Sequence, residues 1–113
     1  MNIIKFDLDK LKKQQDGFSY YILGRSYDLE ENGASQDYNE ALKDFKKAFE
    51  IIKECADQGH IAAIYDLGAN FYYNGNGTER NHKLAEYYLR LAKEAGLKRA
   101  IDKYAEYEFG DER

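Results

Sequence analysis

Two histidines and one cysteine are the side chains in this sequence with the widest chemical range. His60 and His82 lie 22 residues apart, each at the start of a predicted helix, and neither belongs to a spaced metal motif such as His-Glu-x-x-His. We interpret both as exposed helix-start residues. Cys55 falls on the apolar stripe of a predicted helix, so we expect a small buried hydrophobe there, not a nucleophile. These residues predict no catalytic centre and no metal site.

Two further features are of a kind that can bind phosphate or move protons. The glycine-rich stretch 74–78 lacks the Gly-Lys-Ser/Thr ending of a phosphate-binding loop and follows a helix instead of a strand, so we interpret it as a loop between helices. The acidic pairs Glu30-Glu31 and Asp111-Glu112 are typical of solvated helix ends and tails. We therefore predict that the chain is not an enzyme and that it needs no cofactor.

Composition narrows the class of protein and of partner. The chain has 113 residues, of which 43% are hydrophobic and 34% charged, so it can bury a core and is not wholly disordered. Its formal charge of −4 argues against nucleic acid as the main partner, because phosphates attract basic surfaces. No apolar run has the roughly 18 residues of a membrane span. The N-terminal apolar stretch is short and is followed at once by charged residues, so we expect no secretory signal and a cytosolic location.

The elements that must position any functional side chain are helices. Proline is absent, and glycines separate segments in which apolar residues recur every three or four positions. The clearest segment is 38–57, with Asp37 as the predicted N-cap and Gly59 just past its end; 82–95 repeats this scheme with Asn81 and Gly96. In 38–57 we expect Leu42 on the apolar stripe and Asp44 on the solvated face. Less sharply patterned helices are predicted over 8–15, 18–31, 60–73 and 97–109, and residues 3–6 as extended. The sequence predicts an all-α fold.

An internal repeat organises these helices. At an offset of 44 residues Leu23-Gly24 aligns with Leu67-Gly68, and Gly33 aligns with Gly77. The next offset is 37, and the difference of seven lies within the helix 38–57. Because seven residues are close to two helical turns, the insertion lengthens this helix with little rotation of its apolar face. We expect each Leu-Gly pair to mark a seam where two helix backbones approach closely.

The second repeat carries a recognisable pattern. Its residues are Ala63, Leu67, Gly68, Phe71, Gly75, Gly77, Thr78, Asn81, Leu84, Ala85, Ala92, Gly96 and Ala100. This pattern resembles the Sel-one-like repeat (SLR), a relative of the tetratricopeptide repeat; the departures are the seven-residue insertion, Ser19, Glu31 and Asn81. The resemblance implies a short right-handed α-solenoid of antiparallel helix pairs, as one domain over 1–113. It divides into a cap segment 1–17, repeat one over 18–59, repeat two over 60–96, a capping helix over 97–109 and a tail over 110–113.

The resemblance also implies a protein-binding concave side, lined by the first helix of each repeat. Carrying over the groove-facing positions of tetratricopeptide repeats selects Tyr21, Arg25, Asp28, Tyr65, Ala69, Tyr72, Tyr73, Asp102, Glu106 and Phe109. The chain has 11 tyrosines, and tyrosine is enriched at interfaces because it offers a large ring and a polar tip. The alternative is that several of these residues fill gaps between helices.

We interpret the chain as a non-enzymatic module that binds another protein through a tyrosine-rich, partly acidic face. A freestanding acidic chain suits an immunity protein or inhibitor that neutralises a basic toxin. The alternatives are a regulatory adaptor and a self-associating scaffold that forms a homo-oligomer. A hydrolase is the rival of another class, since some SLR proteins are linked to cell-wall or β-lactam chemistry. Those relatives are secreted and cysteine-rich, unlike this chain.

Overall fold

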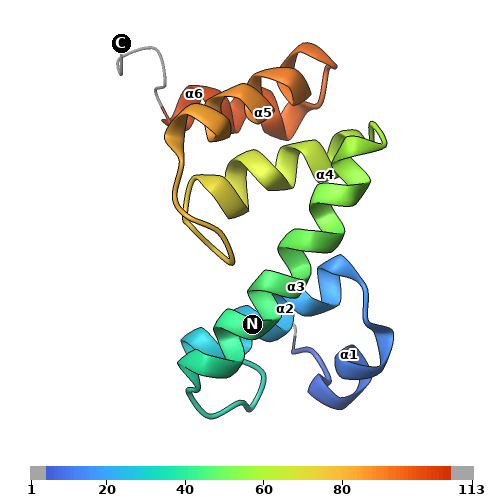
Figure 1. Cartoon of the computed structure of the whole chain (residues 1–113), viewed down its shortest axis with the longest axis vertical. Coiled ribbons are helices and arrows are strands. Elements are labelled where there is room, and N and C mark those ends of the chain that lie inside the picture. Colours follow the sequence, from blue (N-terminus) through green and yellow to red (C-terminus); the bar gives the residue numbers. More distant parts are fainter. Residues whose placement is uncertain (1–4, 108–113) are drawn as a thin grey trace. The chain divides into compact units, whose positions relative to one another are not determined.

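The structure, a computed structural model, describes residues 5–107, and every regular element in this range is helical (Figure 1). The elements in chain order are α1 (Leu8–Gln14), α2 (Gly17–Leu29), α3 (Tyr38–Asp57), α4 (Ile61–Asp66), η1 (Leu67–Tyr72), α5 (His82–Glu94) and α6 (Lys98–Tyr107). The predicted all-α class and the six predicted helical regions are confirmed. Parts of two predicted segments, residues 3–4 and 108–109, lie outside the described residues.

Contacts divide the chain into two compact units, Met1–Ile51 (unit 1) and Ile52–Arg113 (unit 2), which we describe separately. The boundary lies inside α3, so unit 1 contains α1, α2 and the first part of this long helix, and unit 2 contains the later elements. The single domain and the repeat boundaries stated above remain predictions.

Short-range capping fixes where the helices begin and end, as the sequence predicts. The Asp37 carboxylate accepts a hydrogen bond from the Glu40 amide at 3.0 Å, and the Asn81 side chain accepts one from the Leu84 amide at 3.0 Å. Gly59 and Gly96 follow the ends of α3 and α5 with φ of +90° and +91°, a left-handed conformation that favours glycine. The local sequence therefore sets these four boundaries.

The core of unit 1 forms where α2 crosses the first part of α3. Leu23 and Ala48 are almost completely buried there. A Cβ atom built on Gly24 would lie 2.7 Å from Cδ1 of Phe45, closer than real contacts allow. Glycine at this position lets the Phe45 ring pack directly against the α2 backbone, so the first seam joins a backbone to a side chain and not two backbones as predicted.

The second seam, in unit 2, is tighter. A Cβ atom on Gly68 would lie 2.7 Å from Cγ of Leu89 and 2.9 Å from both the Ala85 carbonyl oxygen and the Leu89 amide nitrogen. Leu67, Ala85 and Leu89 have no measurable exposure around it. Here main chain meets main chain, so the glycine has no room for any side chain.

The first helix of repeat two differs from the regular helix predicted over 60–73, because residues 67–72 form a π-helix. A π turn holds one more residue than an α turn. The Ala69 carbonyl, within this segment, accepts side-chain hydrogen bonds from Asn74 at 3.4 Å and from the Tyr107 hydroxyl at 3.3 Å. The Asn74 and Tyr107 side chains thus supply hydrogen bonds to a main-chain carbonyl of the π-helix.

Two residues of α3 occupy environments opposite to those that the periodicity predicts. Leu42, placed on the apolar stripe, is 50% exposed, whereas Asp44, placed on the solvated face, is only 5% exposed. Ala41, Phe45 and Ala48 are buried, and of these Phe45 packs against Gly24 of α2. The helix and most of its apolar stripe are therefore predicted correctly, and the buried face extends to Asp44 instead of Leu42.

Candidate functional site

In unit 1 the predicted site residues Tyr21, Arg25 and Asp28 lie on α2. Tyr21 is half-buried, with its ring 5.8 Å from that of Phe45. Arg25 is exposed and pairs with Glu31 at 3.7 Å. Asp28 is half-buried, and its main-chain carbonyl accepts a hydrogen bond from Gln36. Arg25 and Asp28 therefore present charged groups near the C-terminal end of α2. The Tyr21 ring packs against Phe45, the residue that contacts Gly24 at the first seam.

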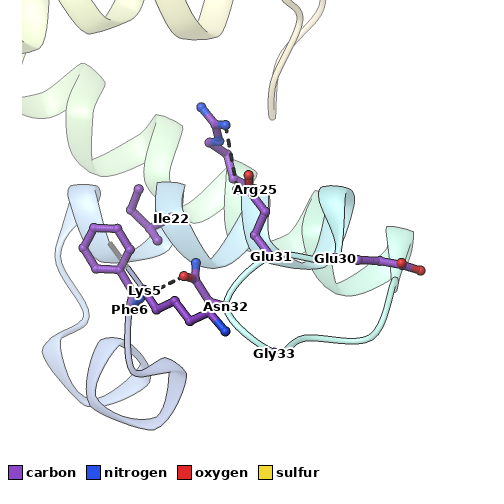
Figure 2. A pocket seen from close by; sticks show the side chains of 8 residues that line it. All are labelled: Lys5, Phe6, Ile22, Arg25, Glu30, Glu31, Asn32 and Gly33. Atoms are coloured by element: carbon purple, nitrogen blue, oxygen red, sulfur yellow. Dashed lines mark hydrogen bonds and ion pairs between the residues drawn. The ribbon is translucent and has the colours of Figure 1, made fainter. Parts of the chain in front are cut away.

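Arg25 also lines a pocket of about 510 Å³ that sequence reasoning missed. Figure 2 shows Phe6 and Ile22 together on one side and the Arg25–Glu31 ion pair on another. Its complete lining is Lys5, Phe6, Ile22, Arg25, Glu30, Glu31, Asn32 and Gly33. The pocket therefore combines an apolar wall with charges of both signs. Nothing in the local sequence indicates it, because Lys5 and Phe6 reach it from a distant part of the chain.

Asn32 holds the loop beneath this pocket in place. Its side-chain oxygen accepts a hydrogen bond from the Phe6 amide at 2.8 Å, and its amide group donates to the Ser26 hydroxyl at 2.8 Å. Ser26, which is fully buried, in turn donates to the Ile22 carbonyl at 2.7 Å. With φ of +56°, Asn32 has a conformation that asparagine tolerates better than most residues. One side chain thus ties the N-terminal segment to the end of α2.

In unit 2 the predicted residues Tyr65 and Tyr73 lie against α6. The guanidinium carbon of Arg99 is 5.0 Å from the centre of the Tyr65 ring. The Tyr73 ring is stacked on Tyr107 with centres 3.6 Å apart and on His82 at 4.7 Å. Both tyrosines are half-buried, so part of each ring remains open to solvent.

Two of the predicted groove residues lie in the interior, which corrects their assignment as partner contacts. Ala69 is 1% exposed and Tyr72 is 8% exposed. The Tyr72 ring is stacked on Tyr88 with centres 5.7 Å apart, and burial raises the pKa of its hydroxyl. The carried-over pattern assumes α-helical spacing, whereas a π-helix turns by a smaller angle per residue, so the Tyr72 side chain at its end is rotated away from its α-helical position. Ala69 lies near the start of the π-helix, where the Tyr107 hydroxyl bonds to its carbonyl.

The remaining predicted residues belong to the C-terminal region. Asp102 and Glu106 are exposed on α6 and form ion pairs with Lys98 at 3.3 Å and Lys103 at 3.2 Å, respectively. Ion pairs this exposed contribute little to stability, so both carboxylates are available to exchange partners. Phe109 lies outside the described residues.

Two carboxyl groups hold their protons unusually well. Burial raises the pKa of Asp44 to about 6, with a smaller contribution from the adjacent Glu40 carboxyl. Oδ2 of Asp44 is buried and has no hydrogen-bond partner among residues 5–107, and the residue lines a pocket of about 350 Å³ in unit 1. In unit 2, burial raises the pKa of Asp66 to about 6, although Arg99 and Asn70 oppose the shift.

The candidate chemical residues are dispersed. Cys55, predicted to be buried, is only half-buried. His60 is exposed as predicted, whereas His82, predicted to be exposed, is half-buried against Tyr73. Among residues 5–107 no group of three or more histidine, cysteine or carboxylate side chains could hold a metal ion. No helix in the described range is long and apolar enough to cross a membrane.

These features define a helical-repeat protein in which capped helices meet at glycine seams. The model of the Sel1 repeat family matches residues 17–60 and 61–97, so the chain belongs to this family. Sel1 repeat proteins generally mediate protein–protein interaction and are typically non-enzymatic scaffolds. The predicted family is confirmed.

Solved structures of two related proteins are similar to this chain. A Sel1 repeat protein from Oxalobacter formigenes is 20% identical, with a TM-score of 0.49 over 88% of this chain and 96% of that one. A protective antigen present in uropathogenic Escherichia coli strains, which displays an SLR fold, is 22% identical, with a TM-score of 0.51. That match covers 88% of this chain but only 28% of the antigen, and it supports the fold alone. No curated protein matches the sequence.

Proposed function

We propose that this chain is a non-enzymatic module that binds another protein through accessible tyrosine and acidic side chains. These side chains lie on the first helix of each repeat and on the capping helix α6. The observation that carries the proposal is the pair of Sel1 repeats, whose family generally binds proteins. The predicted residues that remain accessible form one set in each unit, namely Tyr21, Arg25 and Asp28 in unit 1 and Tyr65, Tyr73, Asp102 and Glu106 in unit 2. Ala69 and Tyr72 are left out because they are buried.

The charge of the surface favours a basic partner. Asp102 and Glu106 are themselves exposed and pair with Lys98 and Lys103 of the same helix, so a basic partner can replace these lysines at little cost. Many toxins that act on nucleic acid are basic, because phosphates attract basic surfaces. We therefore propose an immunity or inhibitor role in the cytosol as the specific form of the binding function.

The test is capture of a partner from an extract of the native cell. Recovery with the wild-type chain is compared with recovery by the triple variant Tyr65→Ser, Asp102→Asn, Glu106→Gln. The matched control is Tyr87→Ser, Glu79→Gln, Glu94→Gln, which changes one exposed tyrosine and two exposed acids away from the proposed surface. Far-UV circular dichroism checks that all three chains are equally helical.

We expect the triple variant to lose the partner and the control to retain it. Equal recovery by both, with helicity intact, would reject the proposed surface. Light scattering that finds only a dimer of this chain favours the self-associating scaffold instead. Turnover of a cell-wall or β-lactam substrate that disappears in His60→Gln or His82→Gln would support the hydrolase alternative.

A further inference from the structure

Three asparagines of this chain directly precede a glycine, namely Asn32, Asn74 and Asn76. An asparagine followed by glycine is chemically labile, because the main-chain nitrogen of the glycine can attack the carbonyl carbon of the asparagine side chain. Glycine has no Cβ atom to obstruct that approach. The three sites consist of the same two residue types, so only their surroundings in the folded chain can distinguish them.

The first requirement of the reaction is a glycine N–H that can lose its proton. A hydrogen bond to a carbonyl oxygen keeps the proton on the nitrogen and holds the nitrogen in place. Gly75 donates such a bond to the Phe71 carbonyl at 2.8 Å. Among the residues that the structure describes, the N–H groups of Gly33 and Gly77 have no hydrogen-bond partner. The first requirement therefore excludes Asn74 and leaves the other two sites.

The second requirement is a side chain that can turn toward the following nitrogen. Asn32 is held at both ends, because Oδ1 accepts from the Phe6 amide and Nδ2 donates to the Ser26 hydroxyl, each at 2.8 Å (Figure 2). Asn76 has a single side-chain hydrogen bond within the described part of the chain, from Nδ2 to the Asn70 carbonyl at 2.9 Å. Turning Asn32 breaks two hydrogen bonds, whereas turning Asn76 breaks one. The second requirement therefore favours Asn76.

We propose that Asn76 is a site of spontaneous modification, at which water converts the side-chain amide into a carboxylate. Asn76 and Gly77 are half-buried, so both remain partly open to the water that the reaction consumes. The proposal is independent of the binding function and concerns the covalent state of the loop that follows η1.

The reaction proceeds in two steps. The Gly77 nitrogen gives its proton to solvent and forms a bond to Cγ of Asn76, while the bond from Cγ to Nδ2 breaks and Nδ2 leaves as ammonia. The product is a cyclic imide. Water then adds to one of the two ring carbonyls and breaks its bond to nitrogen, which yields either aspartate or isoaspartate, in which the main chain runs through the former side chain. Water is the sole co-reactant.

The modification changes how the loop is attached to η1. The Asn70 carbonyl, which Asn76 binds, belongs to the π-helix. An ionised carboxylate cannot donate a hydrogen bond to a carbonyl, and its negative charge is repelled by the carbonyl oxygen. We therefore expect the modified chain to be less stable than the unmodified chain, with the loss arising at the end of η1.

The test incubates the full folded chain in mildly alkaline buffer and follows each asparagine by peptide-mapping mass spectrometry, which detects the change from amide to acid. We expect conversion at Asn76 to be at least about fivefold faster than at Asn74 and at Asn32. The control is the chain unfolded in urea, in which the three sites should react at similar rates.

Three results would overturn the inference. The first is equal conversion of the three sites in the folded chain, and the second is faster conversion at Asn74 or Asn32 than at Asn76. The third is a folded chain that remains unmodified after the unfolded chain has reacted completely. Each would show that the hydrogen bonds of the folded chain do not select Asn76.

Matched variants check the position of the site. Asn76→Gln should abolish the rapid conversion, because the longer side chain must close a larger ring, whereas Asn74→Gln should leave it in place. Rapid conversion that persists in Asn76→Gln would assign the reaction to another residue and overturn the proposal.

A second pair of variants checks the consequence. Asn76→Asp, which is one of the two products, should lower the urea midpoint of unfolding more than Asn74→Asp does, since the Asn74 side chain makes a longer hydrogen bond, at 3.4 Å. Equal midpoints for the two aspartate variants would contradict the role assigned to the bond with Asn70. These readouts involve no partner, so the modification site and the proposed binding function can fail separately.

Discussion

Replacing the seam glycines by alanine tests the packing account quantitatively. In Gly68→Ala the new methyl would meet two main-chain atoms of α5, the Ala85 oxygen and the Leu89 nitrogen, each at 2.9 Å. Neither can move unless the helix itself moves. In Gly24→Ala the three nearest atoms all belong to the Phe45 ring, which can tilt. The two substitutions are identical in chemistry and differ in what the methyl displaces.

The expected magnitudes come from two opposing effects. Alanine stabilises a helix by about 1 kcal/mol relative to glycine, and overpacking a core costs about 1–3 kcal/mol. Because the Gly68 site combines backbone contacts with a π-helical turn that gains less from alanine, we expect Gly68→Ala to destabilise the fold by about 2 kcal/mol. For Gly24→Ala the effects nearly cancel, and we expect a change within about 1 kcal/mol.

Urea unfolding followed by far-UV circular dichroism measures both variants. A loss of about 2 kcal/mol corresponds to a midpoint about 1–2 M lower if the slope lies between about 1 and 2 kcal/mol per M. An unchanged midpoint in Gly68→Ala, or a greater loss in Gly24→Ala than in Gly68→Ala, would refute the reasoning that a backbone contact excludes the side chain.

Three further predictions concern individual side chains. Because the folded chain raises the pKa of Asp44 from 3.8 to about 6, its contribution to stability is fully present below about pH 4 and lost as the pH rises through 6. Between pH 4 and 7 the wild type should therefore lose about 2 kcal/mol more unfolding free energy than Asp44→Asn; parallel pH profiles would contradict this. Asn32→Ala should cost about 2 kcal/mol, and Asn32→Gly, which keeps the positive φ but loses both hydrogen bonds, should cost less. Asn81→Ala should lower the unfolding free energy by about 1 kcal/mol, while Asn81→Asp, which retains a capping oxygen, should restore most of it. Equilibrium denaturation measures both asparagine series, and a neutral alanine variant in either one would disprove the role assigned to that side chain.

Features that depend on neighbouring residues could be predicted from the sequence. The limits of α3 are set by the Asp37 cap and by Gly59, and both act within one helical turn. The repeat offset located both seams, because a glycine in the middle of a helix needs a packing reason and occurs at equivalent positions twice. These features depend either on residues within one helical turn or on a pattern that occurs in both repeats.

The features that could not be predicted depend on how helices rotate against one another. Asp44 and Leu42 exchange the environments that periodicity assigns them, because contact with α2 selects the stripe that becomes buried. Tyr72 lies inside because it ends η1, whose turn is wider than that of an α-helix, and no residue type marks that segment in advance. The pocket beside Asn32 needs a hydrogen bond to Phe6 from 26 residues away. Such contacts depend on tertiary packing between residues far apart in the chain, and local sequence patterns do not reveal it.

The central claim is that this Sel1 repeat chain recognises another protein through its exposed tyrosine and acidic side chains. Its most direct test is the dissociation constant of the captured partner, measured by isothermal titration calorimetry for the wild type, for Tyr65→Ser, Asp102→Asn, Glu106→Gln, and for the matched control on α5 and the preceding loop. We expect the triple variant to bind at least about tenfold more weakly and the control to match the wild type. Equal dissociation constants for all three chains would contradict the claim.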